Sequence, residues 1–135
     1  MMAVSKTDSV TVRSPTDIVL IRQAVRTWTA ELGFSLVDQT KMITAASELA
    51  RNLLDYGGGG TVRFEVLHEV VKRGLRLTFE DQGPGIADLD QAMTDGYTTG
   101  RGMGLGLGGA KRLVQEFEIA SRVGAGTRVT ITRWK

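Results

Sequence analysis

A glycine-rich segment from Gly83 to Gly109 constrains this chain most, because it carries nine glycines and a proline, with six of the glycines between Gly100 and Gly109. Each glycine placed inside a regular helix or strand costs roughly 0.5–1 kcal/mol relative to alanine. The segment is also too long for an ordinary connection, and long loops of this kind are typically lids or binding loops. The chain is therefore expected to build its core from the residues on either side of this segment.

Two helices are expected in the first half of the chain, which has 135 residues in all. The first begins at Ser14, a cap candidate followed by proline, and ends at Gly33, with apolar residues recurring every three or four positions. The second spans residues 35–56 and is stopped by a run of four glycines. An edge strand at residues 9–13 precedes both helices, and the first eight residues are expected to fray.

Strands dominate the rest of the chain, where apolar and polar residues alternate. Residues 72–74 are expected to form one hairpin turn, and residues 124–126 another. A helix at residues 105–116 is expected after the glycine-rich segment. The four strands are expected at residues 61–67, 75–81, 119–123 and 127–134. This order predicts an α+β fold, a two-layer α/β sandwich with a mixed, mostly antiparallel sheet and helices on one face, forming one domain over residues 1–135.

Composition excludes several classes of protein. The chain has no cysteine, so it holds neither a disulfide nor a thiolate metal site. The net charge is +2 and the basic residues are scattered, which argues against a nucleic-acid partner. No apolar stretch approaches the roughly 20 residues of a membrane span, and no signal peptide is recognisable. We therefore expect a cytoplasmic protein without a membrane partner.

Glu48 and Asn52 form the first candidate site, because a spacing of four residues places both side chains on one face of the second expected helix. A carboxylate and a carboxamide together supply the hard oxygen ligands and the proton acceptor needed to hold Mg²⁺ and a reacting hydroxyl group. The nearby charges of Arg51 and Asp55 leave open the alternative of an ordinary charged helix surface.

Asp81 ends a strand and is followed by Gln82-Gly-Pro-Gly-Ile86. It has the same parity as Leu77 and Phe79, so alternation directs its carboxylate toward the core. A buried carboxylate requires hydrogen-bond donors, and the amino group of adenine is one suitable donor. The glycines that follow allow close approach of the backbone. The alternative is a simple turn closed by an aspartate at the end of a strand.

The run from Gly100 to Gly109 is the third candidate site, because closely spaced glycines expose backbone amides to an anion. Arg101 adds a fixed positive charge, and the run leads into an expected helix. The Walker phosphate motif is absent. Glycines 104, 106 and 109 match the dinucleotide-binding spacing, but no strand leads into them and no parallel strand-helix-strand unit is present. A flexible loop without function is the alternative.

Taken together, the three segments resemble the GHKL superfamily of ATPases, to which gyrase, heat-shock chaperones of the Hsp90 type and sensor histidine kinases belong. The run from Glu48 to Asn52 resembles its N box, and the run from Asp81 to Gly85 its first glycine box. Residues 100–108 resemble its lid and second glycine box. Within the superfamily, the chain is similar to RsbT-type serine/threonine kinases of bacterial stress signalling over nearly its whole length. The resemblance implies a Bergerat ATP-binding fold.

The resemblance also implies a role for each candidate residue. Glu48 is expected to orient an acceptor hydroxyl group and take its proton, while Asn52 coordinates Mg²⁺ on the phosphates of ATP. Asp81 is expected to bind the amino group of adenine. The other expected nucleotide-binding residues are Gly83, Gly85, Ile86 and Thr127 around the base, and Arg101, Gly102, Gly104, Leu105 and Gly106 around the triphosphate.

By the same resemblance, the acceptor is a serine or threonine of a STAS-domain antagonist protein, and a partner phosphatase is a second possible partner. Anti-sigma kinases of the same superfamily usually have an alanine and a histidine after the N-box asparagine, whereas Leu53-Leu54-Asp55-Tyr56 follows here. This departure favours the RsbT-type branch. The alternative function is a non-catalytic ATP-binding switch, or an anti-sigma factor that sequesters its partner.

Overall fold

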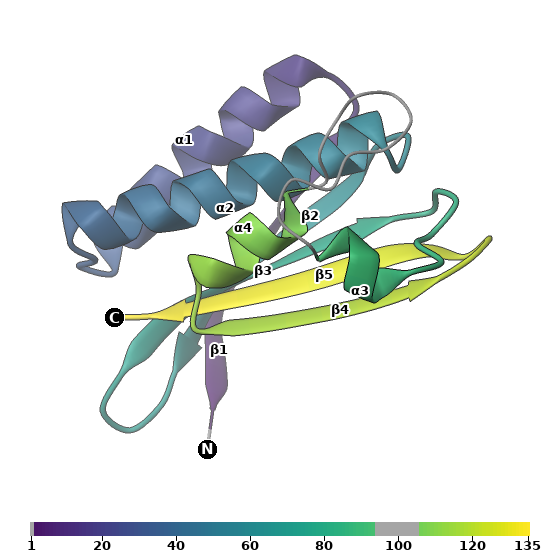
Figure 1. Ribbon diagram of the computed structural model, residues 1–135. Coiled ribbons are helices and arrows are strands. Elements are labelled where there is room, and N and C mark those ends of the chain that lie inside the picture. The colour runs from purple at the N-terminus through teal and green to yellow at the C-terminus, as the bar shows by residue number, and fades with distance from the viewer. Residues whose placement is uncertain (1, 94–105) are drawn as a thin grey trace.

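The computed structural model describes residues 2–93 and 106–135, which build a five-stranded sheet with the two long helices on one face (Figure 1). The strand order is β1-β2-β3-β5-β4. The elements are β1 (Ala3–Val12), α1 (Pro15–Glu31), α2 (Leu36–Asp55), β2 (Gly60–His68), β3 (Arg73–Asp81), α3 (Leu89–Ala92), α4 (Leu107–Arg112), β4 (Glu116–Arg122) and β5 (Gly126–Trp134). The predicted α+β class and two-layer arrangement are thereby confirmed.

Both long helices begin where the sequence predicted, α1 after Ser14 and α2 after Ser35. At α1, one carboxylate oxygen of Asp17 accepts hydrogen bonds from the backbone amides of Arg13, at 2.8 Å, and Ser14, at 3.1 Å. At α2, the Ser35 hydroxyl accepts a hydrogen bond from the backbone amide of Asp38, at 3.1 Å. These bonds satisfy amides near the first turn that would otherwise lack partners.

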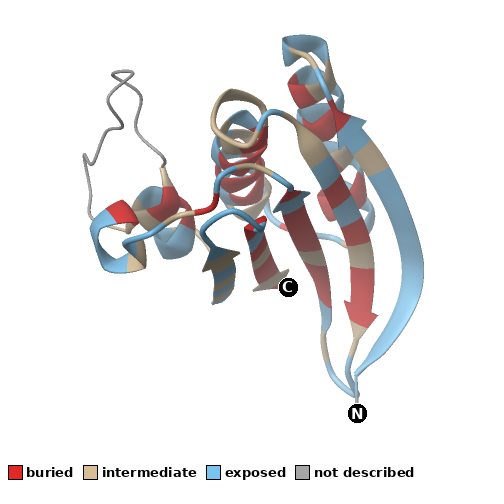
Figure 2. Ribbon diagram, turned by 90° about the vertical axis from the view of Figure 1, so that its right-hand side faces the viewer, coloured by how far each residue is buried: buried red, intermediate tan, exposed pale blue. Residues whose placement is uncertain are grey.

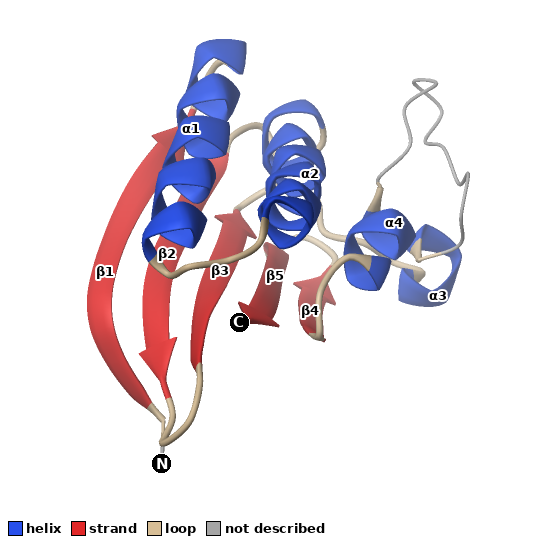
Figure 3. Ribbon diagram, turned by 90° about the vertical axis from the view of Figure 1, so that its left-hand side faces the viewer, coloured by secondary structure: helices blue, strands red, loops and turns tan. Residues whose placement is uncertain are grey.

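The helices cover one face of the sheet and leave the other uncovered, as Figure 3 shows. Figure 2 shows buried residues along the strands and along the inner sides of α1 and α2. The rings of Trp28 on α1 and Phe64 on β2 lie 5.2 Å apart between centroids. Burying a side chain such as Phe64, which is 1% exposed, contributes about 1.5–3 kcal/mol. This packing holds α1 against the sheet.

The sheet differs in three respects from the one predicted. Every pairing among the described strands is antiparallel, so the sheet is not mixed. Residues 3–8 do not fray, because β1 begins at Ala3 and pairs with β2 from the Ala3–His68 partners onward. The turn between β2 and β3 lies at residues 69–72 rather than 72–74, and its ends are joined by a 2.9 Å bond from the Glu69 amide to the Lys72 carbonyl.

Two helical segments also differ from the prediction. The helix α4 ends at Arg112 rather than at residue 116, because pairing with β5 converts the following residues to strand, starting with a bond from the Gln115 amide to the Thr132 carbonyl. The short helix α3 lies inside the glycine-rich segment, and the Asp88 carboxylate caps it. None of the helices within residues 2–93 and 106–135 combines the length and apolar character needed to cross a bilayer.

Candidate functional site

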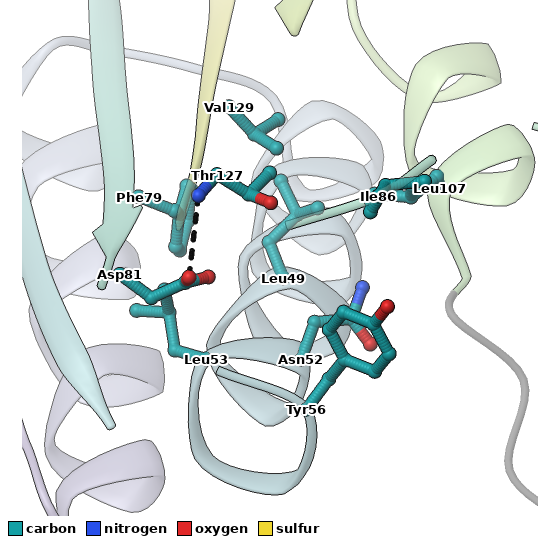
Figure 4. Close-up of a pocket in the computed structure, with 10 residues that line it drawn as sticks. All are labelled: Leu49, Asn52, Leu53, Tyr56, Phe79, Asp81, Ile86, Leu107, Thr127 and Val129. Atoms are coloured by element: carbon teal, nitrogen blue, oxygen red, sulfur yellow. Dashed lines mark hydrogen bonds between the residues drawn. The ribbon is translucent and has the colours of Figure 1, made fainter. Parts of the chain in front are cut away.

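A pocket lies between α2, the end of β3, the start of β5 and the start of α4 (Figure 4). The space between its atoms, open solvent at the mouth included, amounts to about 350 Å³. Most of its walls are apolar, which suits a flat organic ring, and only a few polar groups point into it. The lining residues are Leu49, Asn52, Leu53, Tyr56, Phe79, Asp81, Ile86, Leu107, Thr127 and Val129.

Asp81 is the acidic residue of this pocket and is 8% exposed. Its Oδ1 atom accepts two backbone hydrogen bonds, from Gly83 at 2.9 Å and from Thr127 at 3.2 Å. The carboxylate is therefore held at a fixed angle by the turn after its own strand and by the neighbouring strand β5. Figure 4 shows the Asp81 carboxylate on the same side of the pocket as Thr127.

Gly57 shapes the site from the end of α2, although the sequence indicated only that the glycine run stops the helix. A Cβ atom at Gly57 would lie 2.5 Å from Cγ of Asp81 and 2.6 Å from its Oδ2. Gly83 in turn packs against Gly57, because a Cβ atom at Gly83 would lie 2.8 Å from Cα of Gly57. The backbone after α2 thus packs directly against the acid and its turn. The signal available in the sequence was a glycine run that begins five residues after Asn52.

Asn52 and Glu48 project from the same face of α2 but occupy different places. Asn52 is half-buried and lines the pocket. Glu48 is exposed and lies at the rim, where its carboxylate approaches the backbone of Gly106 so closely that a Cβ atom there would be 2.7 Å from Oε2. The Gly106 backbone has a φ of +67°, a conformation that favours glycine. The rim therefore brings a carboxylate and the start of α4 together.

Other expected residues fall in two groups. Ile86 and Thr127 line the pocket, and Gly83 and Gly85 form the turn beside it. The expected triphosphate-binding residues Arg101, Gly102, Gly104 and Leu105 lie outside the described residues.

Two polar residues that the sequence did not single out contact the same turn. The Tyr56 hydroxyl donates a hydrogen bond to the Gly85 carbonyl, at 2.9 Å, and the Ser121 hydroxyl accepts one from the Ile86 amide, at 2.7 Å. The sequence held no signal for Ser121, since a serine within an alternating strand is an ordinary surface residue.

The part of the chain that builds the pocket is similar to known proteins. Residues 37–135, which contain every element that lines the pocket, match the model of the family described as histidine kinase-, DNA gyrase B- and HSP90-like ATPases. The chain belongs to this ATPase family. The two candidate glycine boxes and the N box fall within the matched residues, and use of ATP follows from membership of the family.

Relatives within the ATPase family narrow the activity. Serine/threonine-protein kinase RsbT of Bacillus subtilis (strain 168) is 47% identical over 118 residues, covering 87% of this chain and 89% of the relative. Anti-sigma F factor of Clostridium novyi (strain NT) is 29% identical over 119 residues, covering 83% of this chain and 82% of that protein. The prediction of a serine/threonine protein kinase in a partner-switching module is confirmed, and it is better supported than the anti-sigma alternative. A protein partner is implied in either case.

Solved structures agree on the fold. The structure of the RsbU and RsbW domains of a Mycobacterium tuberculosis protein matches 96% of this chain with a TM-score of 0.67 at 22% identity, and this chain spans about a third (32%) of that one. The catalytic domain of the histidine kinase ThkA matches 96% of this chain and 95% of its own length, with a TM-score of 0.54 at 12% identity. The α+β fold with one helical layer is therefore that of the ATPase family.

Proposed function

We propose that this chain transfers the γ-phosphoryl group of ATP to a serine or threonine of a STAS-domain antagonist protein in the cytoplasm, where ATP is available. The observation that carries the proposal is the meeting of Asp81 on β3, Thr127 on β5 and Asn52 on α2 in one apolar pocket with Glu48 at its rim. Such an arrangement separates a site for the base from a site for the phosphates.

The base is held by Asp81 and the turn that follows it. Oδ1 of Asp81 is already engaged by two backbone amides, so Oδ2 is the oxygen we assign to the amino group of adenine. Phe79, Leu49 and Val129 supply apolar walls for the ring. A pocket built around a hydrogen-bond acceptor discriminates strongly against a base that lacks the matching donor.

The phosphates are assigned to the open side of the pocket, near Asn52 and Gly106. Mg²⁺, when bound, neutralises charge on the phosphates as the γ-phosphoryl group is transferred. The residues present fit this metal, because Mg²⁺ typically takes one or two protein oxygen ligands and completes its shell with phosphates and water. The carboxamide oxygen of Asn52 is the ligand we assign. Within residues 2–93 and 106–135 no group of three or more acidic or histidine side chains could hold a metal ion. We assign the remaining ligands to the phosphates and water.

Glu48 is assigned as the group that accepts the proton. As the hydroxyl oxygen of the acceptor bonds to the γ-phosphorus, its O–H bond breaks and the proton passes to the Glu48 carboxylate. The bond between the γ-phosphorus and the β,γ-bridging oxygen breaks, and ADP leaves. The exposed position of Glu48 is compatible with this role, because a side chain of another protein has to reach it.

The identity of the partner rests on the resemblance to RsbT-type kinases. In that family the acceptor is a STAS-domain protein, and we assign the same class here. A partner phosphatase is a second protein that this chain is proposed to bind.

Transfer of radiolabelled phosphate to purified STAS-domain proteins tests the proposal. We expect label on one serine or threonine, located by mass spectrometry, and no label when that acceptor is replaced by alanine. Binding of ATP without any transfer would favour the non-catalytic switch instead. If calorimetry detected no binding of ATP with Mg²⁺ present, the assignment of the pocket would be wrong.

A further inference from the structure

The turn from Gly83 to Ile86 is tied to elements on both sides of the pocket. On one side, the Tyr56 hydroxyl at the end of α2 donates to the Gly85 carbonyl, at 2.9 Å. On the other, the Ser121 hydroxyl on β4 accepts from the Ile86 amide, at 2.7 Å. The Gly124 amide adds a third bond, to the Pro84 carbonyl, at 2.8 Å. The turn contains two glycines and a proline. Two of its successive residues, Gly85 and Ile86, are held by side chains from two distant parts of the chain.

Tyr56 reaches the turn because of its place on α2. It follows Asn52 by four residues and Glu48 by eight, so these three side chains lie along one face of the helix. Its ring lines the pocket, as Figure 4 shows, while its hydroxyl is directed to Gly85. The Gly85 backbone has a φ of +76°, and a Cβ atom there would lie 2.2 Å from the Arg122 carbonyl oxygen. Gly85 is therefore confined between the strand β4 behind it and Tyr56 in front of it.

Ser121 connects the turn to the acid of the pocket. Its Oγ lies 2.8 Å from Oγ1 of Thr127 and 3.2 Å from the Gly126 carbonyl oxygen. The Thr127 amide in turn donates to Oδ1 of Asp81, at 3.2 Å. A continuous series of bonds and backbone therefore runs from Tyr56 through the turn and Ser121 to Asp81.

We propose that Tyr56 and Ser121 are positioning residues that hold the Gly83–Ile86 turn, and through it Asp81, in the shape that the nucleotide base requires. The proposal rests on the assignment of this pocket to ATP. The two hydroxyl groups act through the Gly85 carbonyl, the Ile86 amide and the Thr127 hydroxyl. A preformed pocket binds its ligand more tightly, because less conformational entropy is lost on binding.

The test uses Tyr56→Phe and Ser121→Ala, each of which removes one hydroxyl group and little else. The measurements are the dissociation constant for ATP by calorimetry, KM for ATP, and kcat for transfer to the protein acceptor. Because one hydrogen bond contributes about 0.5–1.5 kcal/mol, we expect each variant to raise the dissociation constant and KM about 3- to 10-fold. At saturating ATP, kcat should change by less than about twofold, since neither hydroxyl group is placed at the phosphates.

Ser5→Ala is the matched control, because the Ser5 hydroxyl contacts His68 at the opposite end of the sheet from the pocket. It should leave KM and kcat unchanged. The unfolding midpoint of Tyr56→Phe and Ser121→Ala should fall by less than about 8 °C. The unfolding midpoint and KM together separate a positioning role from a purely structural one. Loss of folded protein lowers the active fraction, and therefore the apparent kcat, but leaves KM unchanged.

Three results would overturn the proposal: an unchanged dissociation constant and KM in both variants, a fall in kcat with KM unchanged, or failure of both variants to fold. If only Tyr56→Phe failed to fold, Ser121→Ala would decide. Failure of the wild-type chain to bind ATP is a different result. It would overturn the assignment of the pocket itself and would be seen before any variant was compared.

Discussion

The carboxylate of Asp81 and the backbone amide of Thr127 are joined by a 3.2 Å hydrogen bond across two neighbouring strands, β3 and β5. The bond joins residues 46 positions apart in the chain. It engages Oδ1 of Asp81, which also accepts from Gly83, and leaves Oδ2 to face Gly57 and the pocket. The orientation of the acid is therefore a property of the sheet, and in the proposed site it would set which edge of the base is bound.

Replacing Asp81 by asparagine should weaken ATP binding before it affects transfer. The asparagine oxygen can still accept from Gly83 and Thr127, but its NH₂ group then meets the amino group of adenine, donor against donor. An unsatisfied pair of this kind costs about 1–3 kcal/mol, so we expect a loss of affinity of about 5- to 150-fold in calorimetry. Asp8→Asn, on the exposed strand β1, is the control and should bind ATP normally. Equal affinity of Asp81→Asn and wild type would contradict the assignment of Asp81.

Replacing Gly57 by alanine should impair both stability and ATP binding. The added Cβ atom would lie 2.5 Å from Cγ of Asp81, so the carboxylate or the backbone after α2 has to shift. Overpacking of this kind typically costs about 1–3 kcal/mol, which denaturant unfolding would measure. Gly109→Ala is the control, because a Cβ atom there meets nothing within 4 Å and alanine favours a helix. Similar losses of stability in the two variants would show that crowding at Asp81 is not the cause.

Glu48→Gln should separate chemistry from binding. Glutamine keeps the shape of the side chain at the rim beside Gly106 but accepts a proton far more weakly. We expect the rate of transfer to the protein acceptor to fall about 100- to 10,000-fold, while affinity for ATP stays within a few-fold of wild type. Glu69→Gln, on the turn between β2 and β3, should transfer at the wild-type rate. A Glu48→Gln variant with full activity would remove Glu48 from the mechanism.

Asn52→Asp should fail at an earlier step than Glu48→Gln. The substitution keeps an oxygen for Mg²⁺ but adds a negative charge where we place the phosphates. Repulsion between like charges in a partly buried site then opposes nucleotide binding as well as transfer. Titration of ATP at several Mg²⁺ concentrations would detect the change, and we expect the affinity to fall at each of them. Unaltered affinity together with unaltered transfer would place the metal elsewhere.

The ion pair between Glu65 and Arg76 should make stability depend on pH in the acid range. Their charged atoms lie 2.9 Å apart between Oε1 and Nε, and the hydrogen bond from Arg76 holds the pKa of Glu65 below its ordinary value of 4.5. Because the folded state binds this proton less readily than the unfolded chain, the stabilisation is fully present above the ordinary pKa. It is lost as the pH falls through the lowered pKa of the folded state.

Denaturant unfolding between about pH 6 and pH 3 would measure this dependence. We expect the free energy of unfolding to decrease as the pH is lowered. The decrease should be less steep in Glu65→Gln than in the wild type. Glu69→Gln, a change of the same type on an exposed turn, serves as the control. Identical pH profiles for wild type and Glu65→Gln would rule out the contribution of the pair.

Local patterns in the sequence were sufficient for the two long helices and for the parity of the strands. Ser14 marked the start of α1, because helix capping depends on residues within one turn of each other. Alternation along β3 placed Asp81 among the buried residues, since successive strand residues face opposite sides. The three segments with candidate site residues were recognisable for the same reason. Each is a short run whose residue types and spacing carry the signal.

Pairing between distant segments decided where several elements begin and end. The strand β1 extends to Ala3 because β2 supplies partners for its backbone, although its own side chains are mostly exposed. The helix α4 stops at Arg112 because the residues after it turn and then pair with β5. A backbone group that gains a hydrogen-bonded partner in the sheet overrides a weak local preference for coil or helix.

The sequence by itself therefore determined the types of its main elements, the faces they bury and the three segments that carry the candidate site residues. The tertiary structure alone decided that β5 lies between β3 and β4, that Gly57 packs against Asp81, and that Tyr56 and Ser121 hold the same turn. The physical reason is the range of the interactions. Capping and periodicity act over a few residues, whereas strand order and the contacts of a pocket depend on burying surfaces that lie tens of residues apart.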